Sequence, residues 1–212
     1  LRTAARRRAV VVVNLSEGEP ASHKDEALGQ LRPHLVLDGA VLAARALGTR
    51  QVHLVLPGET PAVGERIGAA LAERGSSDRV SWQVHTAAAG FVSGQARAVI
   101  ELMSGRPNLP VTAWVPEAVS GYRGRPTLLS NAETFAQLAS IWAHGPDPAT
   151  MLITRAGDTD RPRVLEVVLG GRWDAVLSPA ELARPVLLGG YHGVWVPGGA
   201  LDLRARVRLD RR

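Results

Sequence analysis

The chain has 212 residues, of which 45% are hydrophobic and 21% are charged, and its formal net charge is +5. This balance predicts a soluble globular protein, and no apolar run reaches the roughly 20 residues that a membrane helix needs. Cysteine is absent, which excludes disulfides, thiolate zinc sites and an iron–sulfur cluster ligated by this chain alone. The arginines are dispersed and aromatic residues make up 4%, so the positive charge does not favour nucleic-acid binding. We therefore expect a cytoplasmic protein with neither a nucleic-acid partner nor direct membrane insertion.

Strands and helices are predicted to alternate along the first part of the chain. In chain order, the expected elements are a strand at 9–14 ("AVVVVN"), a helical region at about 25–47 that is interrupted near Pro33, a strand at 51–56, a helix at 62–74, a strand at 80–85 and a helix at 95–103. Two strands joined through a helix form a right-handed parallel crossover. The pattern therefore predicts an α/β fold, a Rossmann-like domain whose parallel sheet is covered on both faces.

The next segments change in character. Residues 111–129 are rich in proline and glycine and are predicted to form an ordered loop. A helix is expected to follow at Ser130, which makes a capping-box pattern with Glu133. After 145–150 the sequence turns to short β-like runs split by glycines, with one helical candidate at 178–183. We expect three parts: an α/β domain over 1–146, a small α+β module over 147–203 and a basic tail over 204–212.

The segment after the first strand, "NLSEGEPASHKDE" at 14–26, carries an amide and several carboxylates. Open α/β sheets bind ligands at the carboxyl ends of their strands, so topology alone predicts a site here. The Asn14 amide can both donate to and accept from a heterocycle or a sugar. Glu17 and Glu19 point in alternating directions in an extended loop, so they need not share one ligand. The alternative is a solvated polar loop in which Asp25 lies in the first turn of the next helix.

A second candidate is the small-residue loop "GFVSG" at 90–94. Gly90 and Gly94 allow the backbone to approach a planar cofactor or a phosphate closely. A tight turn into the following helix explains the same glycines equally well.

A third candidate is the helix start at Ser130 and Asn131. The free amides of a helix N-terminus bind anions, and the Asn131 side chain could add a donor to a phosphate. A capping box without a ligand is the alternative. The six histidines lie far apart with no metal-ligand spacing, so the sequence predicts neither a metal site nor a Ser–His–Asp triad.

Together, and in this order, these segments resemble the 51 kDa flavoprotein subunit family of NADH-ubiquinone oxidoreductase (complex I) and the related subunits of soluble hydrogenases and formate dehydrogenases. The first segment follows the family frame Asn-x-Asp-Glu-Ser-Glu-Pro-Gly-x-x-Lys-Asp, and Lys24, the only lysine of the chain, falls on the lysine of that motif. "FVSGQA" takes the place of Tyr-x-x-Gly-Glu-Glu, and "PTLLSNAET" matches Pro-Thr-x-x-x-Asn-x-Glu-Thr. The segment from "MLITRAG" to "VWVPGG" resembles the small β-grasp, soluble ligand-binding domain of the family.

The resemblance implies an FMN-dependent oxidoreductase that takes hydride from NADH. It implies an electron-transfer partner, a ferredoxin-like iron–sulfur protein or a quinone-linked subunit, and no catalytic side chain of its own. The residues that fall on cofactor-binding positions of the family are Asn14, Ser16, Glu17, Glu19, Phe91, Gly94, Ser130 and Asn131. Of these, Asn14 would hold the flavin, Glu19 would face the nicotinamide, and Asn131 would face the phosphate.

The sequence departs from the family pattern at several positions that bear on the site. Ser16 replaces an aspartate, Phe91 replaces a tyrosine, and Gln95 and Ala96 replace a pair of glutamates. The glycine-rich phosphate loop of the family would lie before Leu1, so it is not expected within the α/β domain at 1–146. A second interpretation therefore stands beside the first: a degenerate, non-catalytic binding or structural module that uses its β-grasp domain.

Overall fold

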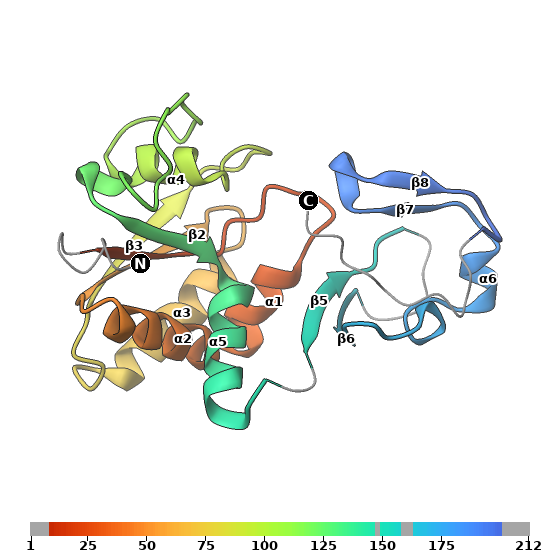
Figure 1. Cartoon of the computed structure of the whole chain (residues 1–212), viewed down its shortest axis with the longest axis horizontal. Helices are drawn as coiled ribbons and strands as arrows, with labels where there is room; N and C mark the ends of the chain where they lie inside the picture. The colour runs from red at the N-terminus through yellow and green to blue at the C-terminus, as the bar shows by residue number, and fades with distance from the viewer. Residues whose placement is uncertain (1–8, 147–148, 158–162, 201–212) are drawn as a thin grey trace. The chain divides into compact units, whose positions relative to one another are not determined.

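The computed structural model describes residues 9–146, 149–157 and 163–200, which form two compact units (Figure 1). Of the described residues, the first unit takes 9–18 and Asp25–Gly145, and the second takes Glu19–Lys24 and those from Pro146 onward. The chain thus leaves the first unit directly after Gly18 and returns to it at Asp25. The predicted basic tail at 204–212 lies outside the described residues.

The first unit is built on a parallel sheet of four strands. These are β1 (Val10–Asn14), β2 (Gln51–Pro57), β3 (Ser81–Ala87) and β4 (Thr127–Asn131), in the order β3-β2-β1-β4. The strands are joined by α1 (Lys24–Leu31), α2 (Pro33–Ala46), α3 (Pro61–Arg74), α4 (Ala96–Met103) and the 3-10 turn η2 (Tyr122–Gly124), and α5 (Ala132–His144) follows β4. Figure 1 shows α4 on one side of the sheet and α2, α3 and α5 on the other. The predicted α/β fold with a parallel sheet is confirmed.

The fourth strand corrects the prediction of a loop over 111–129. Thr127–Asn131 is β4, which pairs in parallel with β1 so that Val12 faces Leu129. The predicted capping box is also wrong, because Ser130 belongs to this strand and the N-cap of α5 is Asn131. A strand of five residues gains its stability from pairing with a distant segment, which local sequence patterns do not report.

The core lies on both sides of β1, whose residues are all buried. Under α4, a cluster of buried side chains joins the sheet to the helix, and its members are Val10, Val12, Val55, Ala87, Val99, Met103 and Tyr122. The predicted coverage of both faces fails at the edge strand β3, where Val84 is 50% exposed and Gln83 is exposed. An edge strand has a neighbour on one side only, so its side chains are less covered than those of β1 and β2.

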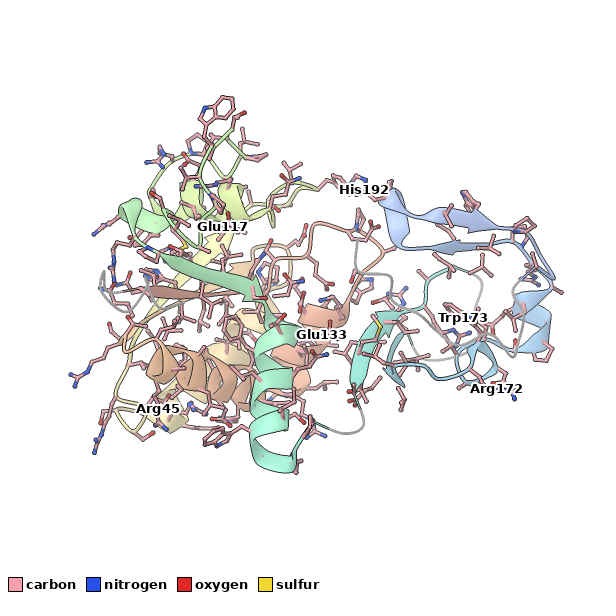
Figure 2. All side chains as sticks on the ribbon, viewed as in Figure 1. Arg45, Glu117, Glu133, Arg172, Trp173 and His192 are labelled. Atoms are coloured by element: carbon pink, nitrogen blue, oxygen red, sulfur yellow. The ribbon has the colours of Figure 1, made fainter. Side chains whose placement is uncertain are left out.

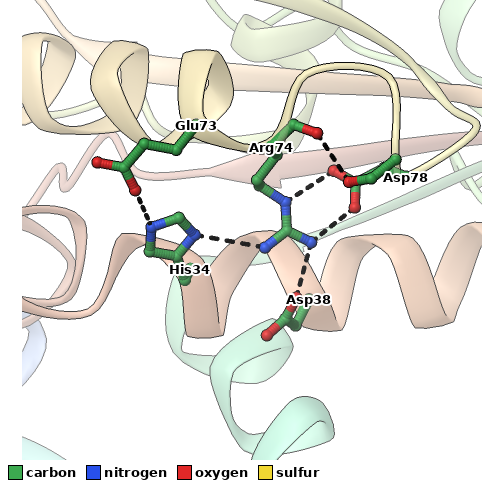
Figure 3. A network of polar contacts seen from close by, with 6 residues as sticks. His34, Asp38, Glu73, Arg74 and Asp78 are labelled. Carbon is green, nitrogen blue, oxygen red and sulfur yellow. Dashed lines mark hydrogen bonds and ion pairs between the residues drawn. The ribbon is translucent and has the colours of Figure 1, made fainter.

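Polar side chains join α2 to α3 on the other side of the sheet (Figure 3). The Arg74 guanidinium donates to both carboxylate oxygens of Asp78, at 2.7 and 2.8 Å, and to Asp38 of α2 at 2.7 Å. These bonds, the one to Asp78 foremost, raise the pKa of Arg74 above its ordinary value. His34 of α2 lies 2.9 Å from the Glu73 carboxylate and adds a second contact between the two helices.

The second unit contains two antiparallel strand pairs, as expected for a small α+β module. One pair is β5 (Thr150–Thr154) with β6 (Val164–Val168), and the other is β7 (Val186–Leu188) with β8 (Val194–Val196). The 3-10 turns η3 (Trp173–Ala175) and η4 (Gly190–His192) and the short helix α6 (Pro179–Leu182) connect them. The side chain of Ser178 and that of Glu181 form a complete capping box at the start of α6.

In the part of the chain that the structure describes, no helix has the length and apolar character to cross a membrane.

Two histidines that are far apart in the sequence meet on the sheet beneath Tyr122. His53 of β2 is 1% exposed, and its Nδ1 lies 2.9 Å from Nε2 of His85 on β3. The Nε2 of His53 is shielded from solvent and has no hydrogen-bond partner. Burial, and then the charges of His85, Arg125 and Arg123, lower the pKa of His53 to about 4. Among the described residues, no group of three potential metal ligands includes this pair.

The His53 site predicts that the fold is sensitive to mild acid. The pKa of His53 is lower in the folded protein than in the unfolded chain, so the fold favours the neutral imidazole. The free energy of unfolding is therefore unaffected by this group above about pH 6.5, and it decreases as the pH falls to about 4. The loss amounts to at most about 3 kcal/mol. Chemical denaturation between pH 7 and 4 should show a shallower decline of the free energy of unfolding for His53→Leu than for the wild type. His144→Gln, at an exposed position, is the control, and an unchanged decline in His53→Leu would contradict the assignment.

Candidate functional site

The carboxyl ends of β1 and β4 form the point where the strand order changes direction. From β1 the chain proceeds to β2 and β3 on one side, and then crosses to β4 on the other side. Asn14 and Asn131, the last residues of β1 and β4, are partners in the register. Open α/β sheets bind ligands at such a switch point, outside the carboxyl ends of the strands. The structure therefore brings the first and third predicted segments together at the expected place.

Asn14 joins the loop after β1 to the loop after β3. Its side chain is 4% exposed, its Oδ1 accepts from the backbone N–H of Ser16 at 3.0 Å, and its Nδ2 donates to the carbonyl of Gly94 at 2.8 Å. A Cβ at Gly94 would overlap the carbonyl oxygen of Ser16, and one at Gly18 would overlap that of Phe91. The glycines thus permit two loops to pack backbone against backbone. Asn14, Ser16 and Gly94, all predicted site residues, are in direct contact.

The loop after β3 is braced by a residue that the sequence analysis did not single out. Asn108 accepts from the N–H of Ala88 at 3.1 Å and donates to the carbonyl of Ser93 at 3.0 Å, so it fixes both ends of the loop. Ser93 itself donates to the carbonyl of Gly90 at 2.6 Å. Phe91, between these contacts, is 43% exposed. An asparagine between two prolines, as in "RPNLP", is the one signal that could have indicated such a bracing role.

Glu17 and Asp25 cap two helices. Oε2 of Glu17 accepts from the backbone N–H of Asp25 in the first turn of α1, at 3.1 Å. Oδ1 of Asp25, whose side chain is buried, accepts from the backbone N–H of Glu133 in the first turn of α5, at 3.2 Å. Figure 2 shows Glu133 at the start of α5. A carboxylate is favourable at a helix N-terminus, because it satisfies free amides and opposes the positive end of the dipole.

Ser130 and Asn131 lie beside this capped helix start, and their side chains have unused hydrogen-bonding capacity. Within the described part of the chain, neither the Ser130 hydroxyl nor the Asn131 amide makes a hydrogen bond, and Asn131 is exposed. Both groups can therefore donate to a ligand oxygen at the switch point. Two neutral donors suit a phosphate oxygen, whereas the Asp25 carboxylate at the same helix start opposes one.

Glu19 belongs to the second unit. Its Oε2 accepts from the backbone N–H of Tyr191 at 2.9 Å, while its Oε1 is shielded from solvent and has no hydrogen-bond partner. The neighbouring His23 donates its backbone N–H to the hydroxyl of Thr154 at 2.9 Å, which fastens the same stretch of chain to β5. A buried acceptor without a donor is unfavourable, so Oε1 of Glu19 is a local cost of the way that this carboxylate is bound.

The predicted site residues therefore fall into four sets. Asn14, Ser16, Gly94 and Phe91 belong to the two packed loops, and Ser130 and Asn131 lie at the adjacent strand end. Glu17 turns to the start of α1, and Glu19 is bound within the second unit. The strand order defines a doubly wound α/β protein, with Asn14 and Asn131 side by side at its switch point.

Comparison with known proteins identifies the family within that class. Residues 1–140 match the model of the Nuo51 FMN-binding domain, and the chain belongs to this family. An NADH-quinone oxidoreductase subunit of Mycobacterium tuberculosis is 29% identical over 211 residues, which cover 90% of this chain and 47% of that protein. The alpha subunit of the NAD-reducing hydrogenase HoxS of Cupriavidus necator is 31% identical over 207 residues, which cover 86% of this chain and 34% of that protein. The resemblance inferred from the three segments is confirmed.

The same relationship holds for solved structures. The crystal structure of a NAD+-reducing nickel–iron hydrogenase in the H2-reduced state matches with a TM-score of 0.86 and 26% identity, over 98% of this chain and 40% of that chain. The air-oxidised state matches with a TM-score of 0.83 and 28% identity, over 92% of this chain and 37% of that chain. This chain spans about half the length of the NADH-quinone oxidoreductase relatives that it matches.

Proposed function

We propose that this chain binds FMN at the carboxyl ends of β1 and β4, oxidises NADH there and passes the electrons to a partner. The register pairing of Asn14 with Asn131 carries this proposal, because it brings the polar ends of two strands to the switch point within the residues of the FMN-binding family match. We assign residues 1–146 to FMN and NADH binding and residues 147–203 to a β-grasp-like module.

The roles of the side chains follow from their contacts. A bound FMN would supply the hydride acceptor, so the protein has to orient the reactants and exclude competing reactions. Asn14 holds the two loops that border the flavin position, and it retains a second amide hydrogen for the flavin. Ser130 and Asn131 donate to the phosphate. Glu19 is kept as a cofactor-binding residue on the match of its loop to the family motif alone.

The electrons must leave through another redox centre, because this chain has no cysteine to ligate an iron–sulfur cluster. The matched relatives are named as subunits of NADH-quinone oxidoreductase and of a hydrogenase. We infer a ferredoxin-like iron–sulfur protein, or a quinone-linked subunit, as the acceptor, and we keep the cytoplasm as the predicted compartment.

Asn14→Ala is expected to weaken FMN binding about tenfold, since the loops after β1 and β3 lose the side chain that joins them. Quenching of flavin fluorescence during titration measures the affinity, at a temperature where both proteins are folded. Gln83→Ala, on the exposed edge strand, is the control and should bind FMN as the wild type does. Equal FMN affinity of Asn14→Ala and the wild type would contradict the placement of the flavin at this strand end.

The catalytic proposal is tested by anaerobic addition of NADH to the FMN-loaded protein. Loss of the oxidised-flavin absorbance, followed by reduction of ferricyanide, is the expected result. A bound flavin that NADH leaves oxidised would contradict the NADH dehydrogenase activity while preserving the FMN site.

A second candidate function is that of a non-catalytic binding module. It is favoured because polar groups of the site already form hydrogen bonds within the protein. Asn14 and Glu17 already make hydrogen bonds within the protein, and the Asp25 carboxylate occupies the helix start that would otherwise attract a phosphate. A protein that takes up neither FMN nor NADH but still folds cooperatively would support this module.

A further inference from the structure

We propose that His53 and His85 form a proton-operated latch, which holds the η2 turn against the sheet at neutral pH and releases it in mild acid. The two side chains join β2 to β3, and Tyr122, the first residue of η2, packs against His53. These residues all lie in the first unit, and His53 is inside its strand rather than at the carboxyl end. The latch therefore operates whether or not a cofactor binds.

The first observation is the contact between the two rings. Nδ1 of His53 lies 2.9 Å from Nε2 of His85, and the rings are stacked with an interplanar angle of 13°. A hydrogen bond at this place needs one nitrogen with a hydrogen and one without, so at least one ring must be neutral. If both rings are protonated, every ring nitrogen carries a hydrogen, and the contact becomes repulsive. Acid therefore opposes this geometry directly.

The second observation is the charge around His53. Its side chain is 1% exposed, and its register partners on β1 and β3 are uncharged. The side chains whose charges act on it, His85, Arg125 and Arg123, are all cationic when they are charged. These neighbours cannot compensate a protonated His53, so its protonation inside the closed structure is unfavourable. A proton is accommodated better once the site has opened to water.

The third observation concerns the element that covers the pair. Tyr122 is 6% exposed and meets His53 with the two ring planes at 65°, with 5.0 Å between the ring centroids. Its phenol is neutral in acid and offers no compensating charge. The next residue, Arg123, has a φ of +53°, which is unfavourable for residues other than glycine. A strained turn that rests on a titrating pair is the element that we expect to open first.

Hydrogen exchange of the turn measures this opening. The N–H of Tyr122 donates to Oγ1 of Thr127 at 2.9 Å, and the N–H of Gly121 donates to the carbonyl of Arg125 at 2.8 Å. Burial holds the pKa of His53 near 4 in the closed form, against 6.5 for an exposed histidine. Between pH 7 and pH 5 the protection of both amides, corrected for intrinsic exchange, should therefore fall about twentyfold.

Urea distinguishes an opening of the turn from unfolding of the whole domain. Opening of a turn exposes little surface, so low concentrations of urea should leave the exchange of the Tyr122 amide unchanged. The amides of β1, which are released by global unfolding, should exchange faster as urea is added. If the turn amides and the β1 amides exchange equally fast and respond equally to urea, the latch is refuted.

Three variants test whether His53 is the group that responds. His53→Leu fills the buried site, and His53→Asn keeps an amide near the position of Nδ1, so at least one of them is expected to fold. Neither side chain titrates, and both variants should lose most of the pH dependence of turn exchange. His34→Gln, at an exposed histidine that contacts Glu73, is the control and should keep the full response. A twentyfold response that persists without His53, or is missing from the wild type, would overturn the proposal.

Discussion

Gly39→Ala is expected to destabilise the protein by about 3 kcal/mol or more, although alanine favours helices over glycine. Gly39 lies in α2, where that helix crosses α5, and an added Cβ would lie 2.5 Å from the carbonyl carbon of Phe135 and closer still to its oxygen. The obstacle is backbone, so no side-chain rotation relieves it. The two helices would have to move apart, and Phe135, which is 2% exposed, would lose its packing.

Gly68→Ala is the matched control for Gly39→Ala. Gly68 lies within α3 at an exposed position, and a Cβ there would meet nothing within 4 Å. This substitution should stabilise the protein by about 1 kcal/mol through helix propensity alone. Urea denaturation measures both variants, and a neutral or stabilising Gly39→Ala would contradict the close crossing of α2 and α5.

The second large effect is expected at Asp25. Asp25→Ala removes the acceptor of the Glu133 N–H and should cost about 1–3 kcal/mol of the free energy of unfolding. Because Glu133 is two residues from Asn131, the loosened helix start should also weaken FMN binding. Asp25→Asn retains an oxygen acceptor, so it should lose less than about 1 kcal/mol.

Asp38→Ala serves as the control for a carboxylate without a buried role. The Asp38 side chain is 52% exposed and pairs with Arg74, and such pairs contribute less than about 1 kcal/mol. Thermal unfolding with flavin titration distinguishes these variants. Equal losses in Asp25→Ala and Asp38→Ala would show that Asp25 does not cap α5.

The sequence predicted the elements whose signals are local. The break between α1 and α2 at Pro33 was indicated by the proline itself, and β1 and β2 by their runs of buried, β-branched residues. The missing strand β4 had no such signal, since its pairing with β1 connects residues more than a hundred positions apart. The Ser130–Glu133 pattern suggested a capping box, but Ser130 belongs to β4 and the N-cap of α5 is Asn131.

The same limit applies to the site. Motif frames located Asn14 and Asn131, but they did not reveal that Asp25 caps α5 across 108 residues or that Asn108 braces the loop after β3. Nor did they reveal that Glu17 and Glu19, two residues apart, are bound in different units. Partners of this kind depend on tertiary packing, which the spacing of residue types along the chain does not encode.

The central claim is that the switch point between β1 and β4 binds FMN, and titration of the purified protein with FMN tests it most directly. The account predicts saturable quenching of flavin fluorescence, with an affinity that falls in Asn14→Ala and is unchanged in Gln83→Ala. A folded wild-type protein that leaves the fluorescence of added FMN unchanged would contradict it.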